Sequence, residues 1–514
     1  IVFVIGAGRY VQRYLYEVDR NEYMVLPAEW DTVTQMWRAY TLADAWPDPA
    51  YDWAQNCAGC HTTGLDVERG RWDDDGVWCE ACHGPGSEHA DLASDAGRRP
   101  SEEELTEIHA AIVLTPDAQV CGQCHSRGTE PDGGHPYPVN YRPGMDLLHE
   151  DIFTLAATDD PQSWWETGQA RGNNMQFNEW LESAHAESLE TMKGSSNAQD
   201  GCVTCHSGDN ALRERILALY EDGGDREDET PPDAITLETA QFSVTCTTCH
   251  SPHEASDVDF FLVDTAYAIC TTCHRNTDLT PGMHHPVQEM FEGQTVVEGV
   301  DGIPSVHFSE EEGPRCVTCH MTRVPIDNAQ LANHTWKPII PGEAEDMPPD
   351  SCSACHTDLT AGDLQSLVLD TQASVRSRLS IAWARVGSIA EPETGSDTRP
   401  LYDRAVAALT FVQNDGSQGV HNYAYTDALL QAASGMLSQL SVPGASLQPT
   451  EAPAPTATMS QPQPVVLGPE APVHTGFRPM TFILLGVTVL TLAIGSWIVS
   501  RRARRQTDIR EAKP

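Results

Sequence analysis

The sequence predicts a mainly α-helical fold with many loops, a small β-rich N-terminal part, a C-terminal helical unit and one transmembrane helix. The 514 residues include 38 Gly and 35 Pro, and hydrophobic residues make up only 40% of the chain. So many turn residues interrupt long periodic segments, and the chain is too long for one ordinary hydrophobic core. A short motif that recurs eight times suggests that bound groups, rather than side chains, fill the interior.

All sixteen cysteines belong to this motif, Cys-x-x-Cys-His. The eight copies consist of Cys57, Cys60 and His61; Cys79, Cys82 and His83; Cys121, Cys124 and His125; Cys202, Cys205 and His206; Cys246, Cys249 and His250; Cys270, Cys273 and His274; Cys316, Cys319 and His320; and Cys352, Cys355 and His356. The motif is the attachment site of a c-type haem. Its two thiols bind the porphyrin edge as thioethers, and the histidine gives the iron an axial ligand.

Two alternatives use the same cysteines. Zinc ribbons pair Cys-x-x-Cys motifs, but they do not require a histidine after every second cysteine. A disulfide framework does not require one either. Because all eight copies carry the histidine and no cysteine is left over, the sequence predicts eight covalently attached haem c groups.

The predicted organisation follows the order of the chain. Residues 1–55 form short strands and turns, 56–360 the haem domain, 361–440 a helical unit, 441–476 a linker, 477–500 the membrane helix and 501–514 a basic tail. A capping box at Ser101 opens one helix. Further helices are predicted over 175–192, 211–220, 361–389, 400–413 and 421–438, with Leu367 among the residues on the apolar face of the third. Eight prolines between 441 and 476 indicate an extended tether.

The C-terminal end predicts a membrane anchor. The 22 residues from Pro479 to Ser500 carry no charge, which is enough to cross a hydrocarbon core of roughly 30 Å. Four arginines between 501 and 505 follow, so the C-terminus is expected in the cytoplasm and the bulk of the protein outside, in the periplasm or at the cell surface. The chain begins without Met or an export signal, and we expect its true beginning to be missing.

Charge excludes one class of function. The formal net charge is −44, which repels the phosphates of nucleic acid. An acidic surface of this kind is typical of solvation in a salty habitat, or of docking to a basic redox partner. The sequence leaves both interpretations open.

Twelve histidines outside the motifs are candidates for the second axial position of a low-spin iron. Eight are predicted as ligands: His89, His149, His185, His253, His285, His307, His334 and His421. His185 is expected on a helix beside Trp180. Adjacent side chains at 284 and 285 are expected to diverge, so that one of them binds, with His285 preferred. His109 and His135 are expected to be structural. Imidazole pairs in a field of carboxylates predict low redox potentials.

Several segments resemble a known family. Residues 25–31, 56–64, 79–89, 180–185, 249–253 and 333–336 are similar to the multihaem c-type cytochromes related to the tetrahaem electron acceptor of nitrification. Gly419-Val-His-Asn422 resembles the C-terminal helices of multihaem nitrite and tetrathionate reductases. The resemblance implies closely packed bis-histidine haems. Some reductases of this wider group carry a lysine-ligated catalytic haem, in part through a Cys-x-x-Cys-Lys motif. This chain has no such motif.

We therefore expect electron transfer on the extracytoplasmic side of a membrane, in an anaerobic or a nitrogen or sulfur respiratory chain, with no catalytic residue assigned. The alternative is an oxidoreductase that acts on nitrite, hydroxylamine or tetrathionate at a five-coordinate haem; a mainly structural subunit is a third interpretation. The membrane segment has no His or acidic residue for quinone chemistry. Expected partners are thus a quinol-oxidising complex, other cytochromes or a terminal reductase, and a homo-oligomer is also compatible with the sequence.

Overall fold

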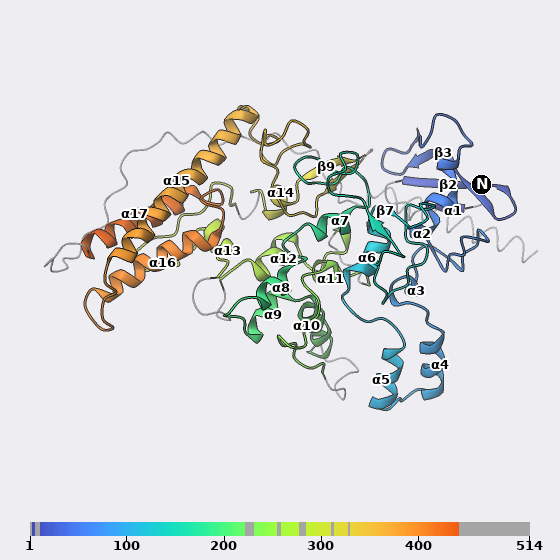
Figure 1. Cartoon of the computed structure of the whole chain (residues 1–514), viewed down its shortest axis with the longest axis horizontal. Coiled ribbons are helices and arrows are strands. Elements are labelled where there is room, and N and C mark those ends of the chain that lie inside the picture. The colour runs from blue at the N-terminus through green and yellow to red at the C-terminus, as the bar shows by residue number, and fades with distance from the viewer. Residues whose placement is uncertain are drawn as a thin grey trace, which may run out of the picture. The chain divides into compact units, whose positions relative to one another are not determined.

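A computed structural model describes residues 3–5, 11–221, 231–253, 259–276, 284–309, 313–326 and 329–440. Short helices and loops dominate these residues, with a small sheet near the N-terminus and three long helices toward residue 440 (Figure 1). The mainly helical fold with a small N-terminal β part is therefore confirmed. The predicted linker, membrane helix and basic tail lie outside the described residues. In the part of the chain that is described, no helix has both the length and the apolarity that a bilayer crossing needs.

The N-terminal part is an antiparallel sheet of four strands in the order β1-β2-β3-β4. The strands are β1 (Phe3–Ile5), β2 (Val11–Asp19), β3 (Glu22–Asp31) and β4 (Met36–Ala39). Leu15 and Val25 are paired across β2 and β3 and are each 1% exposed. They pack with Trp53 and Ala58, so the sheet lies against the first haem motif.

The region that carries the motifs consists of short elements. They are η1 (Pro49–Tyr51), α1 (Trp53–Asn56), α2 (Ala58–His61), β5 (Thr62–Thr63), β6 (Asp74–Asp75), α3 (Cys79–His83), α4 (Ser87–Ala96), α5 (Glu102–Ala110), α6 (Ala118–His125), β7 (Gly128–Thr129), β8 (Thr154–Leu155), α7 (Gln176–Leu181), α8 (Ser188–Lys193), η2 (Asp200–Cys202), α9 (Val203–His206), α10 (Gly208–Glu221), α11 (Cys246–Cys249), η3 (Asp259–Phe261), α12 (Ala266–Cys273), α13 (Val287–Glu292), α14 (Cys316–His320), β9 (Arg323–Ile326) and β10 (Ala329–Ala332). The predicted capping box is present: the Ser101 hydroxyl accepts from the Glu104 amide, and the Glu104 carboxylate accepts from the Ser101 amide.

One predicted helix is wrong. Residues 175–192 form two helices, α7 and α8, separated by a turn that contains His185. The Ser183 hydroxyl donates to the Trp180 carbonyl at 2.6 Å. A small polar side chain that bonds to a nearby backbone group in this way competes with helix continuation. His185 therefore lies in the turn and not on a helix.

The three helices after the last motif form the largest apolar core in the described residues. They are α15 (Ala361–Ser388), α16 (Arg399–Asp415) and α17 (Tyr423–Leu440), close to the predicted ranges. Val375, Leu409 and Leu429 are fully buried between them, together with Met290 of α13. Leu367, predicted on the apolar face of α15, is 57% exposed, because the part of α15 that packs in the core with α16 and α17 begins only at Val375, two turns further along.

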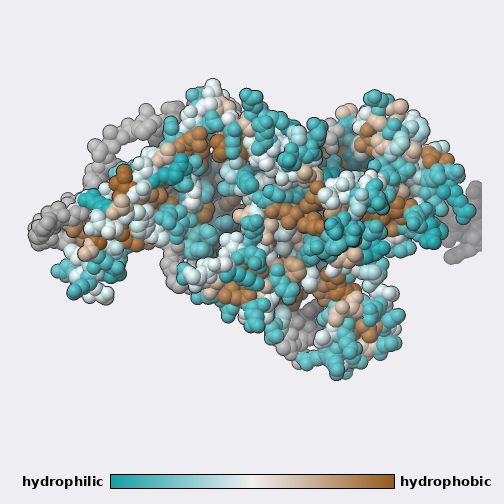
Figure 2. All heavy atoms as spheres, in the orientation of Figure 1, coloured by the Kyte–Doolittle hydropathy of each residue, from teal (hydrophilic) through white to brown (hydrophobic). Residues whose placement is uncertain are grey.

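The remaining apolar side chains gather in five small clusters of three to six buried residues each. On the face that Figure 2 shows, exposed hydrophobic residues also form separate patches among hydrophilic ones. Such clusters bury too little area to offset the conformational entropy of a region this long. The distribution agrees with the prediction that side chains alone do not fill this part of the protein.

Candidate haem-binding sites

Each motif presents its two thiols and its histidine from a single turn of backbone. Seven of the eight motifs include a helical turn, and the eighth, 352–356, forms a hydrogen-bonded turn. The amides of His250, His274 and His356 donate to the carbonyl of the first cysteine of their own motifs at 2.9, 2.9 and 3.0 Å. Because residues three and four apart share one side of such a turn, the two thiols and the imidazole lie on the same side of it. There the thiols would hold one haem by its edge and the imidazole would bind its iron. None of the sixteen cysteines is in a disulfide.

Backbone carbonyls fix the orientation of four motif imidazoles. The Nδ1 atoms of His83, His206, His250 and His320 lie 2.6, 3.1, 2.9 and 2.9 Å from the carbonyls of Val113, Ser188, Phe260 and Trp336. A carbonyl only accepts, so each Nδ1 carries the proton and each Nε2 keeps its lone pair. This arrangement is the one that metal-ligating histidines adopt.

Five motif histidines face a second histidine that the sequence predicts as an axial ligand. Centroid distances are 5.8 Å for His83–His253, 6.1 Å for His274–His185, 6.3 Å for His206–His285, 6.1 Å for His320–His421 and 6.0 Å for His356–His307. Two imidazoles on opposite sides of one metal, with bonds of about 2.0 Å each, have ring centres about 6.3 Å apart. The residues thus fit a bis-histidine iron, while the ligand assignments themselves stay predictions.

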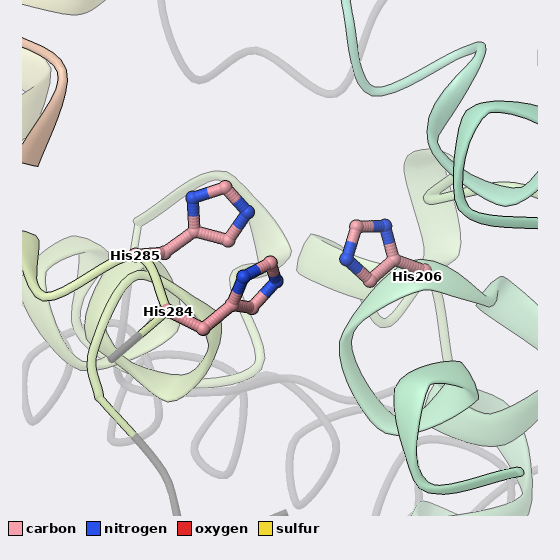
Figure 3. Close-up of side chains that lie close together, drawn as sticks. All are labelled: His206, His284 and His285. Carbon is pink, nitrogen blue, oxygen red and sulfur yellow. The ribbon is translucent and has the colours of Figure 1, made fainter. Parts of the chain in front are cut away.

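His284 and His285 both face His206 (Figure 3). Their ring centroids are 4.0 Å apart, and they lie 6.4 and 6.3 Å from the ring of His206. The expectation that the two side chains diverge is therefore wrong. The reason is the backbone at His285, whose φ of 49° is in the left-handed region and turns the second ring back toward the first. Either histidine can serve the fourth motif.

Burial keeps several of these imidazoles neutral. It lowers the pKa of His185 to about 4, and burial with the nearby charge of His185 lowers the pKa of His274 to about 4. Burial is also the main cause that lowers the pKa of His334 to about 4, with His250 and His125 as neighbouring charges. A metal binds only the neutral imidazole. His334 lies near the third and fifth motifs, and its Nδ1 donates to the Ala332 carbonyl at 3.0 Å, so it fits a ligand to one of them.

The other predicted ligands have different surroundings. His89 Nδ1 donates to the Ile108 carbonyl at 2.9 Å, which ties α4 to α5 and leaves its Nε2 free. His149 has a 56% exposed side chain, and its Nδ1 accepts from the Asp151 amide at 3.3 Å. His421 donates to Asp415: burial lowers the pKa of His421, but the hydrogen bond to Asp415 and its charge outweigh burial and leave the pKa raised.

Two side chains make contacts near the motifs that the sequence did not predict. His135, expected to be structural, has its Nδ1 3.1 Å from the Gln55 carbonyl, two residues ahead of the first motif. Trp336 has a positive φ of 52°, and its ring lies 4.5 Å from that of His185 and 5.6 Å from that of His334. The similarity of residues 333–336 to known cytochromes was the available signal for Trp336. No local pattern pointed to His135, because its partner is 80 residues away.

Cysteines of different motifs lie near one another and place the motifs in an order. Side chains pair between the first and third motifs, the third and fifth, the fourth and sixth, and the sixth and seventh: Cys60–Cys124, Cys121–Cys246, Cys205–Cys273 and Cys270–Cys316. Electrostatic neighbours link the second motif to the third, the fifth to the sixth and the seventh to the eighth: Cys82–Cys121, Cys249–Cys270 and Cys319–Cys355. The motifs therefore form one connected series, 1-3-5-6-7-8, with motif 2 beside motif 3 and motif 4 beside motif 6.

Comparison with known proteins agrees with this geometry. The chain matches the models of the doubled CXXCH motif over residues 240–279 and of cytochrome c554 and c-prime over residues 28–84. The structure of the outer cell wall cytochrome OcwA aligns with a TM-score of 0.67 and 30% identity, over 84% of this chain and 86% of that chain. These features define a protein that binds haem c covalently at several sites. The chain belongs to the multihaem c-type cytochromes, in the same family as OcwA.

A second structure shares the fold. The undecahaem cytochrome from the S-layer of Carboxydothermus ferrireducens aligns with a TM-score of 0.53 and 21% identity, over 85% of this chain. This chain covers 62% of that protein's length. The chain matches no curated protein sequence.

Proposed function

We propose that this protein transfers electrons through eight haem c groups, held by the sixteen motif cysteines and ligated by the eight motif histidines. The observation that carries the proposal is the set of five facing histidine pairs at 5.8–6.3 Å. Two neutral imidazoles per iron favour the low-spin state suited to electron transfer. Bound haem iron supplies reversible one-electron chemistry; the chain supplies spacing, ligands and dielectric.

The contact series of the motifs supports a defined route. Motifs 1 and 8 are its ends. Paired cysteine side chains join motifs 1 to 3, 3 to 5 and 6 to 7, and electrostatic neighbours join 5 to 6 and 7 to 8. Motifs 2 and 4 are side branches, which join at motif 3 through Cys82 and at motif 6 through Cys205. We propose that electrons enter or leave at the ends of this series, where docking of a partner needs no rearrangement of the middle motifs.

The proposed location is the outer face of the membrane, with residues 477–500 as the anchor and a respiratory role in anaerobic or nitrogen or sulfur metabolism. The names of the two related structures support a surface location, since one is an outer cell wall cytochrome and the other comes from an S-layer. The net charge of −44 supports a basic redox partner, because opposite charges accelerate docking. A quinol-oxidising complex, another cytochrome or a terminal reductase fits this role.

The test uses full-length protein from a host that matures c-type cytochromes. We expect a mass equal to the chain plus eight haems and electron paramagnetic resonance signals dominated by low-spin ferric iron. His253→Ala should convert one low-spin centre to high-spin, because it removes the ring that faces His83. His109→Ala, at the exposed end of α5, is the matched control and should leave the spectrum unchanged. A colourless protein of bare polypeptide mass would refute the proposal.

One observation favours a second candidate, an oxidoreductase that acts on a small anion such as nitrite at the first motif. The ring beside His61 is the indole of Trp53, at 5.9 Å, and an indole has no lone pair to give to iron. Burial lowers the pKa of His61, and the charges of Arg13 and Arg127 lower it further. Those two cations would attract an anion to this motif. A high-spin signal in the wild-type protein that changes when nitrite is added would support this candidate, and the absence of any such signal would exclude it.

A further inference from the structure

At the seventh motif the second histidine contacts a buried carboxylate. The ring of His421 faces that of His320 at 6.1 Å. Its Nδ1 lies 2.7 Å from Oδ1 of Asp415, a carboxylate. Four motif histidines, His83, His206, His250 and His320, and one other predicted ligand, His334, instead donate from Nδ1 to neutral backbone carbonyls.

The fold holds this carboxylate in place. Asp415 is the last residue of α16, and its side chain is 1% exposed, against 24% for His421. Its second oxygen accepts from the amide and the hydroxyl of Ser417. The same hydroxyl accepts from the amides of Gly419 and His421. The turn between α16 and α17 therefore fixes both partners of the Asp415–His421 pair.

A buried carboxylate changes what the imidazole gives to a metal. By accepting the Nδ1 proton it raises the basicity of Nε2, as second-shell carboxylates do for metal-bound histidines. Its negative charge, in surroundings of low dielectric, also favours the more positive oxidation state nearby. At a bound haem both effects would stabilise Fe(III) relative to Fe(II).

We propose that Asp415 lowers the redox potential of the haem held by Cys316 and Cys319. The inference rests on the proposed function, because it takes His320 and His421 as the axial ligands. The seventh motif lies between the sixth and the eighth in the contact series. A low potential at the seventh motif raises the energy of an electron that passes between the eighth motif and the sixth. Asp415 therefore tunes the proposed route.

The experiment is a spectroelectrochemical titration of full-length holoprotein carrying Asp415→Asn. Asparagine keeps the shape and an acceptor oxygen but removes the charge. We expect the potential of one haem to rise, the others to stay where they are, and one low-spin species to change its g-values. Asp427→Asn is the matched control. Asp427 lies on α17, is 33% exposed and pairs with Arg378 at 2.7 Å, so this variant loses the same charge without contacting a ligand and should titrate like the wild type.

Two further variants separate the possible failures. His421→Ala should turn one low-spin centre high-spin. If it does, and Asp415→Asn moves no potential, the tuning role is refuted while the proposed ligation stands. If His421→Ala leaves every centre low-spin, the ligation by His421 fails first. Asp415→Glu restores the charge and should return the potential toward the wild-type value. A potential that stays at the Asp415→Asn value would show that side-chain shape, and not charge, caused the shift. That result would refute the inference.

Discussion

Glu179 gives a prediction whose size follows from the structure. This residue of α7 is 4% exposed. Its Oε1 accepts from the Ala170 amide at 2.9 Å and its Oε2 from the His334 amide at 2.7 Å. Burial raises the pKa of Glu179 from 4.5 to about 7, against the two hydrogen bonds, which lower it. The folded protein therefore holds this proton more tightly than the unfolded chain does.

The sign follows from linkage. Because the folded-state pKa is the higher one, this carboxyl contributes most to stability below pH 4.5, and its contribution falls as the pH rises to about 7. The full loss is about 3 kcal/mol, from about 1.4 kcal/mol for each pH unit between the two pKa values. Glu179→Gln stays neutral at every pH. In acid the substitution should lower the free energy of unfolding by about 1–3 kcal/mol, because one backbone amide loses its acceptor. Above neutral pH this difference from the wild type should shrink or reverse, because the wild type then carries a buried charge that glutamine lacks.

The assay is urea unfolding of the holoprotein, followed by far-ultraviolet circular dichroism across this pH range for wild type and variant. Groups that titrate equally in both proteins cancel in the difference between them. Glu182→Gln, an exposed position just after α7, controls for the loss of one charge. If the free energies of unfolding of wild type and Glu179→Gln run parallel across the range, burial does not hold the proton on Glu179 and the reasoning fails.

Two further substitutions test the packing around the motifs. Gly59→Ala should lower the free energy of unfolding by about 1–3 kcal/mol, because its methyl group would overlap the ring of Tyr137. It should also reduce haem attachment at the first motif, measured by mass. Gly387→Ala, whose methyl group meets open space in α15, should leave the free energy of unfolding unchanged. Asn422→Ala should cost about 1–3 kcal/mol in thermal or urea unfolding, since the Asn422 amide donates to the carbonyls of Met290 and Ile303 at 2.9 and 2.6 Å; an unchanged midpoint would show that this contact does not hold α17 against α13.

The local pattern determined the attachment chemistry. Two thiols and a histidine within five residues form one turn that attaches one haem. The attachment sites could therefore be predicted without knowing the fold. Helices with a strong cap or a long apolar face, such as those that begin near Ser101 and residue 361, were predictable for the same reason: their signals lie within a few residues. The helix over 175–192 failed because the Ser183 hydroxyl bonds to a nearby carbonyl, and periodicity does not register that competition.

The tertiary structure decided which histidine faces which motif. The partners of His83, His320 and His274 lie 170, 101 and 89 residues away in sequence, and no pattern of local spacing records such a distance. The same holds for the order of the motifs, which runs 1-3-5-6-7-8 and leaves motifs 2 and 4 as side branches. The backbone at His285, the turn that joins Asp415 to His421 and the burial of Glu179 likewise arise from packing between segments remote in sequence, so residue identity alone could not fix them.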